Sequence, residues 1–174
     1  MSIRYLVAGA AAILLSACAS SNGHQSASVN GRAGQKMTVR TTAYTHTEAG
    51  GSVNGIGGRL RFKSNVRSAA ADWSWLPLGT RFRIAGDKQE YVIEDYGSAL
   101  VGRQTIDMYM PTRKMMNNWG VRHVEIEVLE WGSKSMSLKL LAGRTRHDHV
   151  RTMVASLRGQ GVIAMGAMPK ARTF

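Results

Sequence analysis

Three aspartates in this otherwise basic chain have the placement expected of acid–base groups. Asp72 follows three alanines, and Asp95 ends a strand-like run just before a turn. Asp107 lies inside the apolar run 105–110. A carboxyl group among apolar neighbours is poorly hydrated, which raises its pKa and makes it a candidate proton donor near neutral pH. The sequence therefore predicts an acid–base site, with Asp107 as its strongest member.

The segments around these aspartates carry strand patterns. Residues 121–129 alternate polar and apolar side chains, which is typical of a half-buried strand. Shorter runs predict strands over 36–47, 65–71, 79–86, 90–94 and 105–110. A short helix is predicted over 111–118, with Pro111 near its start and Gly120 after its end. Many short strands with so little helix favour a mainly β fold built as a small barrel.

The loop 48–58 holds five glycines and so has little preferred conformation of its own. A phosphate-binding loop is disfavoured because no Gly-Lys-Ser/Thr ending and no helix follow. We expect a mobile flap beside a groove. Beyond residue 131, an alternating run at 136–140 predicts one more strand, and residues 147–158 have helical spacing.

The order of several short motifs resembles the 3D (three-aspartate) domain. These motifs are Ala43-Tyr44, Ala71-Asp72, the run from Leu76 to Thr80, the run from Glu94 to Gly97, the run from Ile106 to Tyr109, and Trp119-Gly120. The resemblance extends from about Thr41 to Trp131, and Asp72, Asp95 and Asp107 match the three acids. This chain departs from the family in having Ser98 where a second glycine is usual, and in a slightly longer loop between Asp95 and Asp107.

The resemblance implies a six-stranded double-psi β-barrel with one or two short helices and a C-terminal extension. The same barrel is found in membrane-bound lytic transglycosylase A, and it is similar to that of rare lipoprotein A and the expansins. By this resemblance the chain is a peptidoglycan lytic transglycosylase that leaves a 1,6-anhydro product, with Asp107 as its single acid and base. Asp95 would hold the substrate or stabilise charge, and Asp72 would be catalytic or would fix a loop.

Two alternatives fit the same residues. The first is an expansin-like module that binds peptidoglycan without cleaving it. The second is an inverting glycoside hydrolase in which Asp107 is the acid and Asp95 the base. Tyr44, Tyr96 and Tyr109 are candidates for stacking on sugar rings, as are Trp73 and Trp75. Gly97 is a further substrate-binding candidate. Each aromatic ring could equally be core packing.

The amino-terminal segment has the pattern of an export signal. A charged start and a short apolar run over residues 1–17 lead to Leu15-Ser16-Ala17-Cys18, which resembles a bacterial lipobox. We expect Cys18 to carry acyl chains. By resemblance to Gram-negative lipoproteins, Ala19 in place of Asp after the cysteine favours the periplasmic side of the outer membrane. A cleaved signal with an incidental cysteine is the alternative. Residues 18–35, rich in Ser, Asn, Gly and Ala, are expected to form a flexible tether.

Charge and cysteine content narrow the function classes. The formal net charge of +12 predicts an anionic partner, and for an exported chain we expect that partner to be cell-wall carboxylates or anionic lipid head groups. Nucleic-acid binding is disfavoured because no motif accompanies the scattered basic residues. Cys18 is the only cysteine, which excludes an intrachain disulfide and a cysteine-rich metal site. We expect His147-Asp148-His149 to be a solvated surface, and no metal or cofactor to be needed.

The predicted organisation of the whole chain is a signal (1–17), a tether (18–35), a barrel (36–131) and an extension (132–174).

Overall fold

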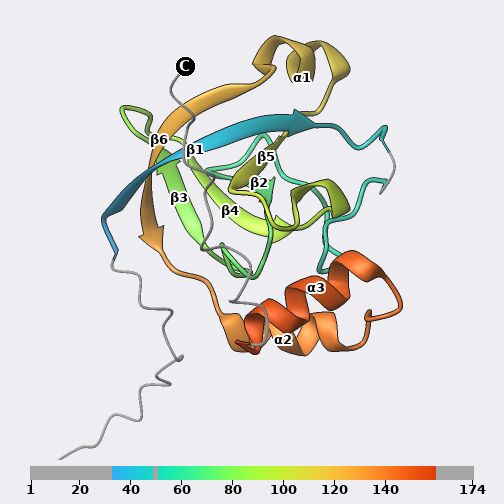
Figure 1. The fold of residues 1–174 in the computed structure, drawn as a ribbon. Helices are drawn as coiled ribbons and strands as arrows, with labels where there is room; N and C mark the ends of the chain where they lie inside the picture. The colour runs from blue at the N-terminus through green and yellow to red at the C-terminus, as the bar shows by residue number, and fades with distance from the viewer. Residues whose placement is uncertain (1–32, 49–50, 160–174) are drawn as a thin grey trace, which may run out of the picture.

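Six strands close into a barrel in the computed structural model, which describes residues 33–48 and 51–159 (Figure 1). The strands are β1 (Gln35–Tyr44), β2 (Val66–Ala70), β3 (Arg81–Ile84), β4 (Glu90–Asp95), β5 (Thr105–Tyr109) and β6 (Arg122–Glu130). They follow one another around the barrel in the order β1-β5-β2-β4-β3-β6. The pairs β1·β5 and β2·β4 are parallel, and the other pairs are antiparallel. The mainly β class and the six-stranded barrel are therefore confirmed.

The barrel interior is filled by apolar side chains that alternate along each strand. In β6, Ile126 and Val128 are fully buried. Glu125, which precedes Ile126, is exposed. Phe82 of β3 and Tyr91 of β4 stack inside with ring centroids 5.4 Å apart. This alternation produced the strand predictions because each strand turns one face to the core and the other to solvent.

Short helices connect or follow the strands. The 3₁₀-helix η1 (Ser98–Leu100) lies between β4 and β5, and α1 (Arg113–Trp119) lies between β5 and β6. Thr112 caps α1 by accepting a hydrogen bond from the backbone N–H of Met115. Gly120 ends α1 with φ of 60°, a conformation that favours glycine.

The segment after β6 is helical, so the strand predicted at 136–140 is wrong. Residues 134–142 form α2 (Lys134–Ala142), and the predicted helix near 147–158 is present as α3 (Asp148–Leu157). Ser133 caps α2 at the N–H of Met136, and Ser137 and Leu141, one turn apart, are both buried. Because the β1·β6 and β3·β6 pairings already close the barrel, no free edge remains for another strand. The described part of the chain thus has three α-helices rather than one or two.

Helices α2 and α3 pack side by side against one end of the barrel and share its core (Figure 1). Leu141, Val150 and Met153 belong to the same buried cluster as the strand residues. The backbone N–H of Leu78 donates to Ser137 Oγ at 2.9 Å. At Gly132 a Cβ atom would lie 2.3 Å from the carbonyl oxygens of residues 77 and 78, so this junction requires glycine. The C-terminal helices are therefore fixed to the barrel.

The predicted signal segment 1–17, Cys18 and nearly all of the predicted tether lie outside the described residues, as does the segment 160–174. Within the described ranges, no helix is long and apolar enough to cross a membrane.

Candidate active site

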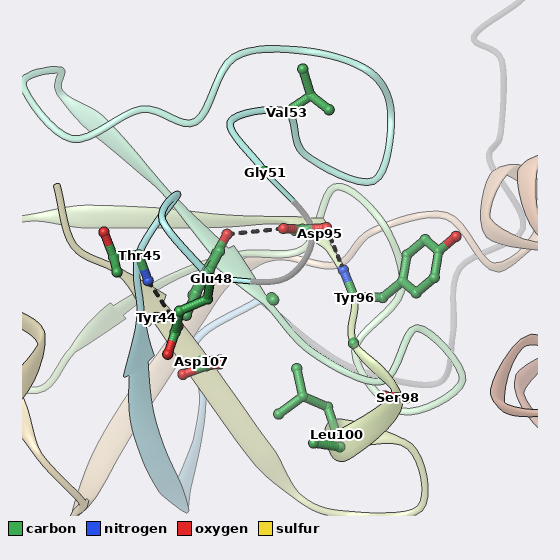
Figure 2. A pocket seen from close by; sticks show the side chains of 13 residues that line it. Tyr44, Thr45, Glu48, Gly51, Val53, Asp95, Tyr96, Ser98, Leu100 and Asp107 are labelled. Atoms are coloured by element: carbon green, nitrogen blue, oxygen red, sulfur yellow. Dashed lines mark hydrogen bonds between the residues drawn. The ribbon is translucent and has the colours of Figure 1, made fainter. Parts of the chain in front are cut away.

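A pocket of about 280 Å³ opens beside the strands that carry Asp95 and Asp107 (Figure 2). Its walls come from the end of β1 and the loop after it, from β2, from β5, and from the segment between β4 and η1. The lining residues are Tyr44, Thr45, Glu48, Gly51, Val53, Ala70, Asp95, Tyr96, Gly97, Ser98, Ala99, Leu100 and Asp107. Segments far apart in the sequence therefore meet at one cavity.

Strand register brings the two acids together. Thr42 of β1 pairs with Asp107 of β5, Asp107 pairs with Ala70 of β2, and Ala70 pairs with Asp95 of β4. Residues that pair across strands share a face, so these four side chains form one row, which we call the acid row. Ala70 stands between the two carboxyl groups, and its small side chain leaves the space above it to the pocket.

A β-bulge selects Asp95 for this row. The pairing of β2 with β4 shifts between Ala69 and Ala70, so that Ala69 pairs with Ile93 and Ala70 with Asp95. Without the extra residue, Glu94 would face Ala70. Glu94 instead pairs with Arg61 and accepts a hydrogen bond from Ser68 Oγ. The bulge thus separates an acid used for an ion pair from an acid used at the pocket.

Asp107 is poorly hydrated and has little hydrogen-bond compensation. Thr42 Oγ1 donates to Asp107 Oδ1 at 2.7 Å, and Oδ2 has no partner among the described residues. Burial raises the pKa of Asp107 to about 6 against the opposing effect of the Thr42 hydrogen bond. The negative charges of Glu48 and Asp95 raise this pKa further, and Arg40 lowers it. At pH 7 a pKa of about 6 leaves roughly a tenth of Asp107 protonated, about a hundredfold more than at the ordinary value of 3.8.

Asp95 is held by more donors than Asp107. Tyr44 Oη donates to Asp95 Oδ2 at 3.1 Å, and the backbone N–H of Tyr96 donates to Oδ1 at 2.9 Å (Figure 2). Burial raises the pKa of Asp95, while hydrogen bonds from Tyr96, Tyr44 and the backbone of Gly55 oppose that rise. Burial also raises the pKa of Tyr44, so its hydroxyl stays protonated and remains a donor. Asp95 is therefore the better placed of the two to remain a carboxylate.

Asp72 is placed differently from the other two predicted acids. It is buried and does not line the pocket. Its Oδ1 accepts hydrogen bonds from the backbone N–H and the hydroxyl of Ser74, at 2.8 and 2.7 Å. Its Oδ2 accepts from the backbone N–H of Gly102 at 2.8 Å. Asp72 thereby links the turn after β2 to the loop before β5, the strand that carries Asp107.

The predicted sugar-contacting residues divide into two groups. Tyr44, Tyr96 and Gly97 line the pocket. Tyr109 does not line it; its ring lies 5.6 Å from that of Tyr44, and its hydroxyl lies 3.2 Å from His46 Nδ1. Trp73 is fully buried, and its Nε1 donates to the backbone oxygen of Asp95 at 2.9 Å. Trp73 is therefore core packing that also fixes the backbone of Asp95.

Four residues in or beside the pocket were not anticipated from the sequence. Glu48 reaches the pocket from the loop after β1, and its one signal in the sequence is that it is the only acid of the glycine-rich segment 48–58. Thr42 and Ala70 depend on strand register, for which the sequence carried no signal. Gly55 lies in the same loop as Glu48. It approaches Tyr96 so closely that a Cβ atom on Gly55 would lie 2.9 Å from the Tyr96 ring. The loop is thus packed onto the site at that position.

No group of three or more His, Cys, Asp or Glu residues within 33–48 and 51–159 is arranged to hold a metal ion. The chemistry available in the described pocket is that of three carboxyl groups, Glu48, Asp95 and Asp107, beside tyrosine hydroxyls and rings.

Comparison with known proteins finds similarity in the part of the chain that carries Asp72, Asp95 and Asp107. Residues 67–130 match the 3D domain family. The chain is 35% identical over 106 residues to the cell wall-binding protein YocH of Bacillus subtilis (strain 168), which is 60% of this chain and 36% of YocH. It is 34% identical over 102 residues to the putative cell wall shaping protein YabE of the same organism, which is 58% of this chain and 24% of YabE. The similarity thus spans roughly a third or less of each relative.

Proposed function

This chain contains a 3D domain, and from that premise we propose that it is a peptidoglycan lytic transglycosylase with Asp107 as both acid and base. The substrate class is supported by the names of the two relatives, one cell wall-binding and one a putative cell wall shaping protein. The net charge of +12 suits a polymer rich in carboxylates.

The observation that carries the proposal is the state of Asp107. Its pKa is raised to about 6, it lines the pocket, and it has one oxygen without a partner among the described residues. A general acid must hold its proton near the working pH and must reach the leaving group. Of the two acids in the acid row, Asp107 meets these conditions better than Asp95, because it accepts fewer hydrogen bonds.

The proposed reaction needs only one carboxyl group for proton transfer. Asp107 gives its proton to the glycosidic oxygen as the bond from the muramyl anomeric carbon to that oxygen breaks. The resulting carboxylate takes the proton of the muramyl 6-hydroxyl, and that oxygen forms the new bond to the anomeric carbon. Asp107 ends protonated as it began, and no water is consumed. Asp95, held by Tyr44 and the Tyr96 N–H, stabilises the positive charge that develops on the sugar ring.

A second candidate is a module that binds the wall without cleaving it. The observation that favours it is the relative YocH, which is named for cell wall binding. Under this function the same pocket would hold a sugar between Tyr44 and Tyr96, and the carboxyl groups would accept hydrogen bonds from sugar hydroxyls.

For location, we propose that the chain acts outside the cytoplasm, anchored by lipid at Cys18 to the periplasmic side of the outer membrane. The lipobox-like sequence and the wall-related names of the relatives support this. Replacing Cys18 with Ala should move the protein from the membrane fraction to the soluble fraction. Unchanged fractionation would contradict the anchor.

The experiment that tests the activity is mass spectrometry of soluble fragments released from purified sacculi. A lytic transglycosylase gives muropeptides about 18 Da lighter than those with reducing ends, because an internal hydroxyl replaces water as nucleophile. Reducing ends would indicate the hydrolase that uses Asp95 as base. Binding to sacculi without release would favour the binding module. The Asp107→Asn variant is the matched control, since any release that survives it comes from another source.

A further inference from the structure

A second hollow, of about 390 Å³, adjoins the pocket at Tyr96. It is lined by Tyr96, Gly143, Arg144, Arg146 and His147, so it lies where the loop between α2 and α3 meets the barrel. Tyr96 lines both cavities. A ligand that occupied the acid pocket could therefore extend past the Tyr96 ring into this hollow. These loop residues fall outside the 67–130 segment that matches the 3D family.

The hollow is basic. Three of its lining side chains are Arg or His, and none is acidic. Among residues 33–48 and 51–159, neither Arg144 nor Arg146 forms a salt bridge with an acid. The acid nearest in sequence, Asp148, does not line the hollow and is paired with Arg151. Because two guanidinium groups gather without a counter-charge, the hollow attracts an anion.

Arg144 is held in position at the boundary of the two cavities. Its Nη1 donates to the backbone oxygen of Gly55 and to Tyr96 Oη, the latter at 3.1 Å. Its guanidinium carbon lies 6.0 Å from the centre of the Tyr96 ring. These contacts use one nitrogen, so the other donors of the guanidinium group have no partner in the described part of the chain. A fixed guanidinium group with free donors binds an anion at low entropic cost.

Arg146 and His147 form the exposed side of the hollow. Arg146 Nε donates to His147 Nε2 at 3.1 Å, which leaves the two terminal nitrogens of Arg146 free among the described residues. The His147 ring lies 5.6 Å from that of His149, which in turn lies 6.1 Å from the Tyr96 ring. His147 thus lines the hollow, and His149 is in ring contact with both His147 and Tyr96.

We infer that this hollow is a subsite for a carboxylate of the peptide stem that branches from the glycan strand. The inference rests on the proposed function, since it places a muramyl residue in the acid pocket. The stem leaves the strand from that same sugar, so its carboxylates lie within reach of a cavity that shares a wall with the pocket. The C-terminal helices would then make the site prefer peptide-bearing glycan to denuded glycan.

The test is a binding measurement on the full chain with two synthetic probes. One is a GlcNAc–MurNAc disaccharide that bears a peptide with free carboxylates, and the other is the same molecule with those carboxylates amidated. We expect amidation to weaken binding about fivefold to tenfold, as for loss of partly exposed charge-assisted hydrogen bonds. In Arg146→Gln the effect of amidation should shrink to about twofold to threefold, because the carboxylate has lost one of its two guanidinium partners while Arg144 remains.

Lys139→Gln is the matched control, because it removes one positive charge from an exposed position on α2 that does not line the hollow. It should keep the full effect of amidation. An equal loss in Lys139→Gln and Arg146→Gln would show a general charge effect and overturn the subsite. So would an amidation effect that Arg146→Gln leaves unchanged. Competition by millimolar inorganic phosphate that removes the contrast would assign the hollow to phosphate and overturn the carboxylate assignment.

The outcome is separable from that of the proposed activity. Binding of the probes does not require bond cleavage, so a chain that releases no anhydro products from sacculi can still show the contrast between free and amidated stems. Conversely, a chain that releases anhydro products but binds both probes equally retains the proposed function and loses the subsite. A chain that binds neither probe overturns this inference.

Discussion

The acid row and the turn at Asp72 both place aspartates in water-poor surroundings, yet they supply very different numbers of donors. Asp72 accepts three hydrogen bonds, two from Ser74 and one from Gly102. Asp107 accepts one, from Thr42. The pKa of Asp107 rises to about 6 because burial is so weakly compensated. A buried acid is therefore reactive or structural according to its donors, and burial alone does not distinguish the two.

The largest expected contrast is in activity. Asp107→Asn removes the transferable proton while it keeps the shape and the Thr42 contact, so glycan release should fall by about 10²-fold to 10⁴-fold. Release of muropeptides from sacculi, measured by chromatography, checks this. Asp87→Asn, at the exposed turn between β3 and β4, should leave the rate unchanged. A rate within twofold of wild type for Asp107→Asn would remove Asp107 from the chemistry.

The second contrast is in stability. Asp72→Ala leaves three donors without an acceptor, so the free energy of unfolding should fall by about 2 to 4 kcal/mol. Urea denaturation measures it. Asp87→Ala, which loses one exposed hydrogen bond to the Gln89 N–H, is the control and should cost under about 1 kcal/mol. If Asp72→Ala folds as stably as wild type but loses glycan release, Asp72 belongs with the reactive acids.

The third prediction concerns stability again, but here removing the aspartate should stabilise the fold at neutral pH rather than destabilise it. The pKa of Asp107 is about 6 in the folded chain and 3.8 ordinarily, so between these values the folded state holds more protons than the unfolded state. Ionisation of Asp107 therefore lowers stability as pH rises from about 4 to 6, by at most about 3 kcal/mol. Asp107→Asn removes this loss. Its stability relative to wild type should increase between pH 3.5 and pH 8, as measured by urea denaturation, and a constant difference would contradict the raised pKa.

The smallest expected effect comes from Glu48. Its negative charge raises the pKa of Asp107, so Glu48→Gln should move that pKa down. Because the reaction needs protonated Asp107, the alkaline limb of the rate profile should shift to lower pH by less than about one unit. Glu125→Gln, on β6 and away from the pocket, should leave the profile in place. A shift toward higher pH would show that Glu48 acts by another route.

The parts of the fold that the sequence predicts are those in which local pattern and tertiary burial agree. The alternation over 121–129 gave β6 because one face of that strand packs on the core. The alternation over 136–140 wrongly predicted a strand. Six strands already close the barrel, and that closure depends on all of them together, so it cannot be read from a local pattern. That segment therefore folds as α2, with Ser137 and Leu141 on its buried face.

The site shows the same division. Asp107 could be singled out by its apolar flanks, and Asp95 because it ends a strand-like run before a turn. The structure places both in one pocket. Thr42 and Ala70 could not, since they join the acid row only through the pairing of β1, β5, β2 and β4. Arg144 was equally hidden, because its contacts with Gly55 and Tyr96 depend on how the C-terminal helices pack.

The pairing of Thr42 with Asp107 has a kinetic consequence. The two residues are 65 positions apart, on strands that run parallel and so need a long connection. Contacts between such distant segments form late, because the loop between them must first lose its entropy. Until β5 docks between β1 and β2, Asp107 is hydrated and its pKa stays near 3.8, so at neutral pH it has no proton to give. Barrel closure is therefore the step that turns this carboxylate into an acid.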